Sequence, residues 1–427
     1  MKIKRSFFKI HGWIGTRLSI LFFIVCFSGT LATLSNEMDW LFNPEMRATP
    51  REELAPRNEI LKNLREEYPT ASFTYWMRPD EPYLADIIYL VEDGKRSYVF
   101  ANRYTGEVQG ESQLTIQRFF RDLHYYLFIP FNIGHYTVLL FGFLLLISLI
   151  TALLFYKKWW RKLFELQTGK GTLVLFRSLH RLVGLWSVPF SILFSITGIW
   201  YFLERSDLLT EEVNPGAPRL ENTEMAEAQL PLSYTIDYDK AVAIAENSIP
   251  GITVGDIIPP ENSTSAIYLT GKGEEPLVRQ RANRVYLDPL SYEVARVQKA
   301  EQISTSMWLN DIADPLHFGN WGGLITKFIW FVFGLGISSL ILTGIWITLK
   351  RNALKRKKKQ KPVMGAWSYV NWGIFLVFIG YMYHRLITGY NLPVSGLVYI
   401  SLGWIVFLAL TYYLFIYRLK KAVFKTG

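Results

Sequence analysis

Residues 178–200, SLHRLVGLWSVPFSILFSITGIW, are almost all apolar, yet this run starts beside a histidine, and the 427-residue chain has only six. Residues 9–31, KIHGWIGTRLSILFFIVCFSGTL, repeat its pattern. Each run contains H-x-x-x-G and a further glycine eighteen residues after the histidine. Each is also long enough to cross a membrane as a helix, which takes about 20 apolar residues. Because an ionisable side chain in such a helix is costly, the two histidines point to a function.

The composition is that of a membrane protein, because 50% of the residues are hydrophobic and only 19% are charged. Two polar segments of domain size, 36–123 and 204–316, alternate with apolar runs, and their helical and β-rich patterns predict a small α+β module in each. We therefore predict a mainly α membrane protein, a six-helix transmembrane bundle with two such modules. The predicted spans are residues 13–35, 133–156, 182–203, 325–349, 366–387 and 393–416.

The positions of lysine and arginine predict the orientation of the spans. Basic residues cluster before the first span and after the second, fourth and sixth, and six spans place these clusters on one side. Both termini should then be cytoplasmic and both modules should lie outside, in a periplasm or its equivalent. The net charge of +10 reflects this topology and contact with anionic lipid rather than nucleic-acid binding. The clusters comprise Lys2, Lys4, Arg5, Lys9, Lys157, Lys158, Arg161, Lys162, residues 350–361, Arg418, Lys420, Lys421 and Lys425.

The same pattern divides the chain into helices, modules and loops. The first span is predicted to stay in the mature protein, and not to be a signal peptide, because its pattern recurs in an internal helix. In order, the predicted parts are helix 1 (1–35), the first module (36–123), helix 2 (124–160), a cytoplasmic loop with helix 3 (161–203), the second module (204–316), helix 4 (317–350), a basic cytoplasmic loop (351–365), and helices 5 and 6 with a cytoplasmic tail (366–427).

Internal similarity predicts that the chain is a tandem duplication. Each copy runs helix, polar segment, helix. In the polar segments, Asn102 and Asp288 fall at the turn after a strand, where their side chains can bond the local backbone. The matched elements are F-G-x8-T at 141–151 and 333–343, RDLHYYLF (121–128) with ADPLHFGN (313–320), and VFANRYTGEV (99–108) with VYLDPLSYEV (285–294).

The duplication predicts which histidines meet. Because each copy crosses the membrane twice, the two copies have the same orientation and are related by an axis along the membrane normal. This axis pairs His11 with His180 near the cytoplasmic surface. It pairs His124 with His317 near the outer surface.

The histidine pattern predicts haem. Eighteen residues at 100° per residue make five full turns, so an unbroken helix places each leading histidine and its distant glycine on one face. Such a face suits a flat ring whose iron is held by imidazole. One such histidine alone is most simply an interfacial polar residue, but four at matched positions predict ligation of two haem irons by His11 with His180 and His124 with His317. The glycines predicted to line the rings are Gly15, Gly29, Gly184 and Gly198.

Two further histidines, His135 and His384, have no counterpart in the repeat, and the position that matches His135 is Lys327. We expect each to be an interfacial or substrate-side residue. An exchange of one of them for His124 or His317 as a ligand stays open.

Other chemistry has little support in the sequence. Cys26 is the single cysteine, which excludes intrachain disulfides and sites with several cysteine ligands, and we expect it to pack inside helix 1. The chain has no glycine-rich nucleotide motif, no H-E-x-x-H and no G-x-S-x-G. No catalytic side chain is therefore predicted.

The duplicated layout, the FSGTL and SITGIW helices, the DLH and DPLHFG elements and the NRYTGEV and LDPLSYEV strand ends together resemble the PepSY-associated transmembrane family. The resemblance covers about residues 5 to 350, and helices 5 and 6 look like a variable extension. The chain departs from the usual strand end, because Asn102 replaces aspartate and Tyr292 stands where glycine is common.

This family includes iron-regulated inner-membrane proteins and siderophore reductases. The resemblance implies a membrane oxidoreductase with two b-type haems in a bacterial inner membrane, which reduces a ferric siderophore or other ferric chelate in the periplasm. By motif, His11 and His180 would hold the cytoplasmic-side haem and His124 and His317 the outer one. The electron donor would be a quinol or a cytoplasmic flavoprotein reductase.

Two other functions are consistent with the sequence. In the first, the outer modules bind a peptide or protease, and the protein is a non-enzymatic regulator. In the second, the protein is a transporter, since parallel repeats with helix breaks at the midplane are typical of transporters. Pro189 supplies such a break in helix 3, but helix 1 has no matching proline, and this asymmetry counts against transport.

Overall fold

The computed structural model describes residues 2–206, 208–209, 213–220, 231–262, 264–354 and 365–417. Most of the predicted basic loop and the predicted cytoplasmic tail lie outside the described residues, at 355–364 and 418–427. The chain forms two compact units. The membrane unit comprises Met1–Thr33, Phe120–Leu203 and Phe328–Gly427, and the sheet unit comprises Leu34–Phe119 and Glu204–Lys327.

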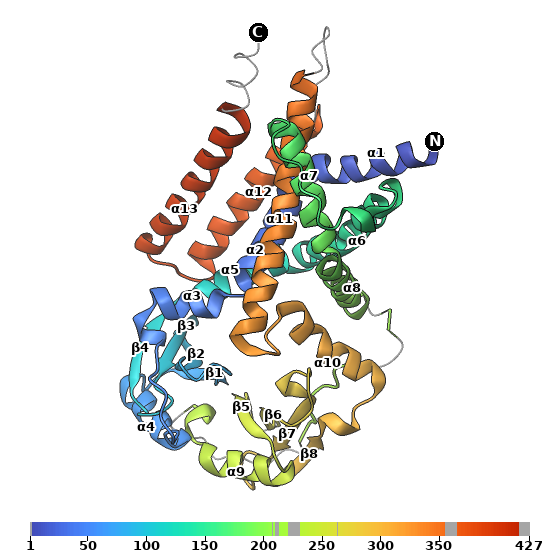
Figure 1. The fold of residues 1–427 in the computed structure, drawn as a ribbon. Helices are drawn as coiled ribbons and strands as arrows, with labels where there is room; N and C mark the ends of the chain where they lie inside the picture. Colours follow the sequence, from blue (N-terminus) through green and yellow to red (C-terminus); the bar gives the residue numbers. More distant parts are fainter. Residues whose placement is uncertain are drawn as a thin grey trace. The chain divides into compact units, whose positions relative to one another are not determined.

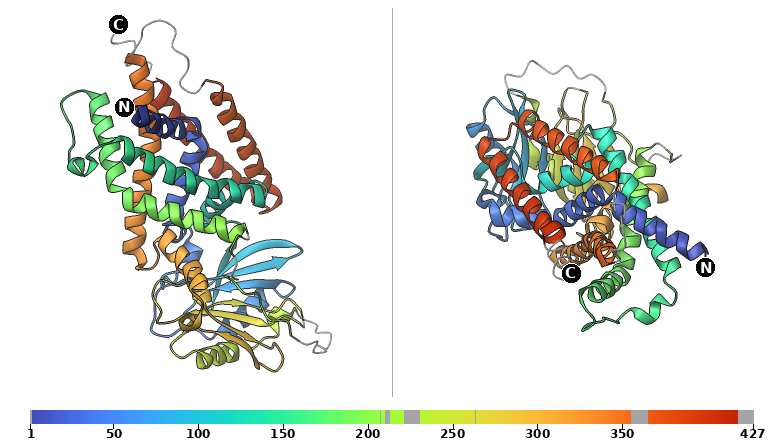
Figure 2. Two further views of the ribbon diagram at one scale, coloured as in Figure 1. Left: turned by 90° about the vertical axis from the view of Figure 1, so that its right-hand side faces the viewer. Right: turned by 90° about the horizontal axis from the view of Figure 1, so that it is seen from above.

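The membrane unit is built of helices (Figure 1), and the same helices are seen from two further directions in Figure 2. They are α1 (Lys2–Arg17), α2 (Ser19–Ala32), α5 (Ile116–Tyr126), α6 (Phe131–Phe155), α7 (Thr172–Trp186), α8 (Val188–Arg205), α11 (Gly323–Leu354), α12 (Trp367–Thr388) and α13 (Val394–Tyr412), with a 3-10 turn at Trp159–Lys162 and a π-helical turn at Tyr413–Tyr417.

Among the described residues, three helices are long and apolar enough to cross a membrane, namely α6, α11 and α13. The pairs α1 with α2 and α7 with α8 each form one broken apolar run, so the count rises to at most five. The fifth predicted span, 366–387, forms α12, which is not among these candidates. The chain is thus a mainly helical membrane protein, and the six-helix bundle stays a prediction.

Both broken runs bend seven residues after their histidine, at Leu18 in the first and at Ser187 in the second. The bends measure 74° and 59°. Pro189 lies at the second position of α8, where its missing amide proton interrupts the helical hydrogen bonds. The break that the sequence predicts at this proline is therefore confirmed.

The first bend has no proline. Instead, the hydroxyl of Thr16 donates to the Gly12 carbonyl at 2.7 Å, and that of Ser19 donates to the Thr16 carbonyl at 3.2 Å. Side chains that bond the preceding turn in this way compete with the helical ladder and bend helices.

These bends overturn two expectations. His11 and Gly29 lie in different helices, as do His180 and Gly198, so neither pair shares one helix face. The expectation that only the second run is broken is also wrong, because both runs are broken at the same distance from the histidine. That asymmetry was the argument against transport.

The sheet unit contains an eight-stranded antiparallel sheet with the order β4-β3-β2-β1-β5-β6-β7-β8 (Figure 1). The strands are β1 (Ser72–Met77), β2 (Asp86–Glu92), β3 (Lys95–Ala101), β4 (Val108–Ser112), β5 (Thr253–Ile258), β6 (Ile267–Lys272), β7 (Asn283–Leu287) and β8 (Val294–Gln298). The helices are α3 (Ser35–Phe42), α4 (Arg57–Glu67), α9 (Tyr238–Ser248) and α10 (Thr305–Phe318), with 3-10 turns at Pro44–Met46, Leu232–Tyr234, Gln280–Ala282 and Ala300–Gln302.

The two predicted modules share this sheet. Each supplies a helix followed by four strands, and β1 of the first pairs with β5 of the second at Trp76 and Ile257. The predicted turns are confirmed, because Asn102 and Asp288 each accept two backbone N–H bonds within three residues. Tyr292, which stands where glycine is common in the family, adopts φ 62°, a left-handed conformation that glycine adopts most readily.

One face of the sheet packs on α4 and α9. Because side chains alternate along a strand, every second residue of β2, β3, β6 and β7 reaches this core, and β1 and β5 reach it on both sides of an irregularity in their register. Fully burying a side chain of this size contributes about 1.5–3 kcal/mol, so a core drawn from both modules holds them together. Its members include Ile60, Leu61, Leu64, Trp76, Ile88, Leu90, Val99, Tyr238, Ala241, Ala245, Ile257, Ile267, Leu269, Val285 and Leu287.

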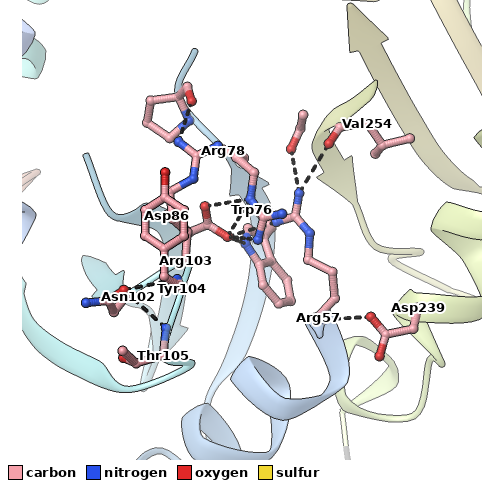
Figure 3. A network of polar contacts seen from close by, with 12 residues as sticks. Arg57, Trp76, Arg78, Asp86, Asn102, Arg103, Tyr104, Thr105, Asp239 and Val254 are labelled. Atoms are coloured by element: carbon pink, nitrogen blue, oxygen red, sulfur yellow. Dashed lines mark hydrogen bonds and ion pairs between the residues drawn. The ribbon is translucent and has the colours of Figure 1, made fainter. Parts of the chain in front are cut away.

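A buried ion network lies at the β1–β5 junction (Figure 3). Arg57, the first residue of α4, donates to a carboxylate oxygen of Asp86 at 3.0 Å and to the carbonyl of Gly255 at 3.1 Å. Asp86 also accepts from Arg78 at 2.8 Å and from the indole of Trp76 at 2.9 Å. Arg57 and Asp86 are only 3% and 0% exposed. One guanidinium thus joins the two modules.

The charges in this network depend on one another. Burial lowers the pKa of Arg57 to about 9, against the attraction of Asp86. Burial alone would raise the pKa of Asp86, but the guanidinium groups of Arg57 and Arg78 together hold that pKa below its usual value. Removal of one partner therefore leaves an uncompensated buried charge, which is strongly destabilising.

The shared sheet constrains the path through the membrane. Strands that pair must lie on the same side of the bilayer, so the chain between β4 and β5 crosses an even number of times. The unbroken helix α6 is a candidate for one crossing. If α6 crosses, the bent pair α7 and α8 must supply the return crossing, although neither half is a candidate span by itself.

We predict that Arg57→Ala lowers the free energy of unfolding of the sheet unit by about 3–5 kcal/mol, because it leaves Asp86 and two carbonyls without this donor. Hydrogen exchange of the β1 and β5 amides in the full-length protein measures the change. Lys62→Ala on the same helix is the control. Its ion pair with Glu66 is exposed, so the effect should stay within about 0.5 kcal/mol. Equal effects of the two substitutions would contradict the prediction.

A second prediction concerns pH. Burial raises the pKa of Asp256 to about 6, although its carboxylate accepts a bond from Tyr75 at 2.6 Å. An acid with a higher pKa in the folded state binds protons on folding between about pH 4 and 6, so stability should increase as the pH falls from 7 to 5. Asp256→Asn should flatten this dependence of the unfolding midpoint. An unchanged slope in the variant would show that other groups cause it.

Candidate functional site

The two leading histidines lie close together. His11 is on α1 and His180 is on α7, and the structure places their ring centres 6.4 Å apart with the ring planes at 84°. The predicted approach of these two side chains is confirmed. Their role as ligands stays a prediction.

The ring of His11 is oriented by α6. Its Nδ1 lies 3.0 Å from the backbone carbonyl oxygen of Ser148 and 3.1 Å from the Ser148 hydroxyl. A carbonyl oxygen can only accept a hydrogen bond, so Nδ1 carries the proton. The lone pair of the neutral ring is therefore on Nε2, the nitrogen that a metal would bind.

The ring of His180 is oriented by α11. Its Nδ1 lies 2.9 Å from the hydroxyl oxygen of Thr343. That hydroxyl donates its proton to the Ser339 carbonyl at 2.8 Å, so it accepts from His180. His180 therefore also carries its proton on Nδ1 and its lone pair on Nε2. Partners of this kind fix the tautomer and orientation of metal-binding histidines.

The distance between the two ring centres is compatible with one metal held by both imidazoles. A metal–imidazole bond is about 2 Å long and a ring centre lies roughly 1 Å from Nε2, so two rings on one metal have centres roughly 6 Å apart. A Cβ built on Gly15 would meet no heavy atom within 4 Å, and one on Gly184 would meet only Leu340 methyl groups, at 3.8 Å. The helix surfaces one turn beyond both histidines are thus uncrowded, as a flat ring requires.

His124 is held by a different helix pair. It lies on α5, and its Nδ1 donates to the Val25 carbonyl of α2 at 2.9 Å. A Cβ on Gly29 would lie 2.6 Å from His124 Cε1, so only glycine permits this approach. Gly29 is thus placed beside His124 and not beside His11, a neighbour that the sequence alone did not reveal.

Gly198 also has another neighbour than expected. A Cβ on Gly198 would lie 3.5 Å from Gly142 Cα, so α8 and α6 approach backbone to backbone. Similarly, a Cβ on Gly334 would lie 2.6 Å from the hydroxyl of Thr30 on α2. Gly142 and Gly334 are the glycines of the two F-G-x8-T motifs. These motifs therefore mark helix crossings, and Gly198 does not provide clearance beside His180.

The other histidines differ in burial. His135 is 3% exposed, stacks on Phe131 with ring centres 5.3 Å apart, and donates from Nδ1 to the Tyr125 carbonyl. His384 is exposed on α12. His317 lies on α10 in the sheet unit, whereas His124 belongs to the membrane unit. The predicted approach of His124 and His317 therefore stays a prediction.

Lys327, which the sequence matched to His135, takes part in a buried ion cluster of the sheet unit. Its ammonium group lies 3.0 Å from a carboxylate oxygen of Glu37 and also pairs with Glu81. Tyr83 donates to the same Glu37 oxygen at 3.1 Å. No sequence pattern predicts this cluster, because its members are far apart along the chain.

The sequence of the chain matches a known family. Residues 8–351 match the PepSY-associated TM region, which is more than half of the chain. The chain belongs to this family. The resemblance expected from the motifs is thereby confirmed, and α12 and α13 lie outside the matched region of this PepSY-associated protein.

A relative of the chain is the uncharacterized protein PA4219 of Pseudomonas aeruginosa. The two are 24% identical over 263 residues, which cover 54% of this chain and 63% of that protein. The chain thus matches less than two thirds of this relative. The comparison supports the family and assigns no activity.

We predict that Thr343→Val weakens the affinity of the full-length protein for haem by about 10- to 100-fold, because it removes the group that holds the His180 ring. Titration of haem into protein purified without it measures the affinity. Thr411→Val on α13 is the control, because its hydroxyl donates to the Phe407 carbonyl of its own helix and has no described contact with either histidine. If both variants bind haem like the parent, His180 is not a ligand that Thr343 orients.

Proposed function

We propose that this protein transfers electrons through two b-type haems in a bacterial inner membrane and reduces a ferric siderophore, or another ferric chelate, on the periplasmic side. One electron per iron converts Fe(III) to Fe(II), which hard oxygen ligands hold less tightly. The released product is then Fe(II). The observation that carries the proposal is the pairing of His11 with His180.

The surroundings of these two side chains support a cofactor role over an interfacial one. Both rings are only partly exposed, and each has Nδ1 bound to an oxygen of a neighbouring helix. An interfacial histidine would gain most from water. Two oriented imidazole rings whose centres lie 6.4 Å apart are instead compatible with bis-imidazole ligation.

A haem in this position supplies one-electron chemistry, with a potential set by its ligands, their hydrogen bonds and burial. The chain's own groups control those factors. The Ser148 carbonyl and the Thr343 hydroxyl accept hydrogen bonds from the Nδ1–H groups, which raises the basicity of each Nε2. Gly15 and Gly184 have no side chain, so the adjacent helix surfaces leave room for a flat ring.

The second proposed pair is His124 with His317, by the correspondence of DLH with DPLHFG. The bond from His124 to the Val25 carbonyl fixes its tautomer in the same way as that of His11. The proposed duplication supplies the pairing, and the proposed orientation places the sheet unit outside. We propose that a quinol or a cytoplasmic flavoprotein reductase supplies the electrons, since the chain has no nucleotide motif.

A transporter is the second candidate, and the two broken runs favour it. Helix breaks at matched positions of two parallel halves are a feature of transporter binding sites. Substrate uptake by vesicles that contain haem-free protein would support transport. Reduction without uptake would exclude it.

We predict that the purified protein shows the reduced absorption bands of b-type haem with close to two haems per chain. His180→Ala should remove one haem and leave the other, and His11→Ala should remove the same one. His384→Ala is the control and should keep both, because His384 is exposed and has no proposed partner. A colourless protein from cells with ample haem would falsify the proposal.

The reductase activity needs its own assay. Reduced protein in detergent is mixed with a ferric siderophore, and a ferrous-specific chelator reports the Fe(II). His180→Ala should lose most of the rate. Equal rates in the parent and the variant would mean that iron reduction does not pass through this site.

A further inference from the structure

The two C-terminal helices, α12 and α13, lie outside the family match, and nothing so far gives them a role. The connection between them is tightly closed. The amides of Gly389 and Tyr390 both donate to the Arg385 carbonyl, at 2.9 and 3.1 Å, and that of Leu392 donates to the Leu386 carbonyl at 3.0 Å. This connection therefore holds the Tyr390 side chain in a defined position.

Tyr390 reaches the helix that carries His124. Its hydroxyl donates to a carboxylate oxygen of Asp122 on α5, and the hydroxyl of Tyr126 donates to the same oxygen at 2.7 Å. Asp122 is 1% exposed and Tyr390 is 8% exposed. A buried carboxylate needs such donors, so this contact is strongly favoured.

Contacts hold α5 on two sides. Residues two apart on a helix point about 200° apart, so Asp122 and His124 face in nearly opposite directions. On one side, Tyr390 binds Asp122. On the other, His124 binds the Val25 carbonyl of α2. The orientation of the His124 ring therefore depends on both contacts.

The backbone conformation of the turn after α5 does not by itself determine the orientation of the His124 ring. Leu127 and Phe128 both have φ 56°, a left-handed conformation that such residues rarely adopt. Two consecutive residues of this kind persist only where surrounding contacts impose them. Both are 2% exposed, so packed neighbours enclose this turn.

We propose that Tyr390 is a positioning residue for His124, which acts by holding α5 through Asp122. The C-terminal helix pair then has a role, because it fixes a group of the core that the family match covers. The predicted effect of Tyr390 on a bound haem rests on the proposed function. The predicted effect of Tyr390 on the stability of α5 is independent of that function.

The test is Tyr390→Phe in the full-length protein, which removes one oxygen atom and little else. The control is Tyr383→Phe, because Tyr383 pairs with Ser401 at 2.5 Å within the same two helices and is not part of the Asp122 network. Hydrogen exchange of the α5 amides should be at least about tenfold faster in Tyr390→Phe, the factor expected for loss of a bond to a charged group. The control should match the parent.

The second readout is the electron paramagnetic resonance spectrum of the oxidised protein, in which His124→Ala identifies the signal of the haem bound by His124. Tyr390→Phe should shift this signal and leave the other unchanged. Unchanged exchange in α5 would overturn the proposal. Faster exchange with an unshifted signal would also overturn it, because Tyr390 would then be structural only. If the protein binds no haem, the proposed function fails, and the exchange result still decides whether Tyr390 holds α5.

Discussion

The pairing of β1 with β5, held by the bond of Arg57 to Asp86 and to the Gly255 carbonyl, is the constraint on which the topology depends. It places two polar segments, which residues 120–203 of the membrane unit separate, in one sheet. The chain between these two segments must then cross the membrane an even number of times, so that it returns to the side on which it started. If α6 crosses the membrane, the bent run of α7 and α8 must cross back, although neither half is a candidate span by itself.

The bends have a consequence for the histidines. Because each run breaks seven residues after its histidine, the helix that carries the histidine is free to pack at an angle of its own. His11 then reaches α6 and His180 reaches α11, the helices that supply their Nδ1 partners. A straight helix would have aligned histidine and distant glycine on one face, as the sequence predicted. In the structure these glycines contact other residues instead: Gly29 lies beside His124, and Gly198 lies beside Gly142.

The sequence predicts what local chemistry decides. It placed Asn102 and Asp288 in their turns, because such side chains bond the neighbouring backbone, and it located the break at Pro189. It missed the bend at Leu18, where no proline marks it. It also missed the shared sheet, because strand pairing between distant segments leaves no local pattern. The approach of His11 to His180 was predictable only because the two halves of the sequence are similar, and a predicted axis between similar halves pairs their matching residues.

The candidate site divides in the same way. The identity of a metal-binding side chain is a local property, and a motif can predict it. The orientation of such a side chain is not a local property. Each described Nδ1 bond of His11, His124 and His180 ends on an oxygen of another helix. Substitutions at those partners therefore act on the ring without changing the ligand. Since the potential and affinity of a bound metal depend on ligand orientation and basicity, helix packing would tune a metal held here in addition to the choice of ligand.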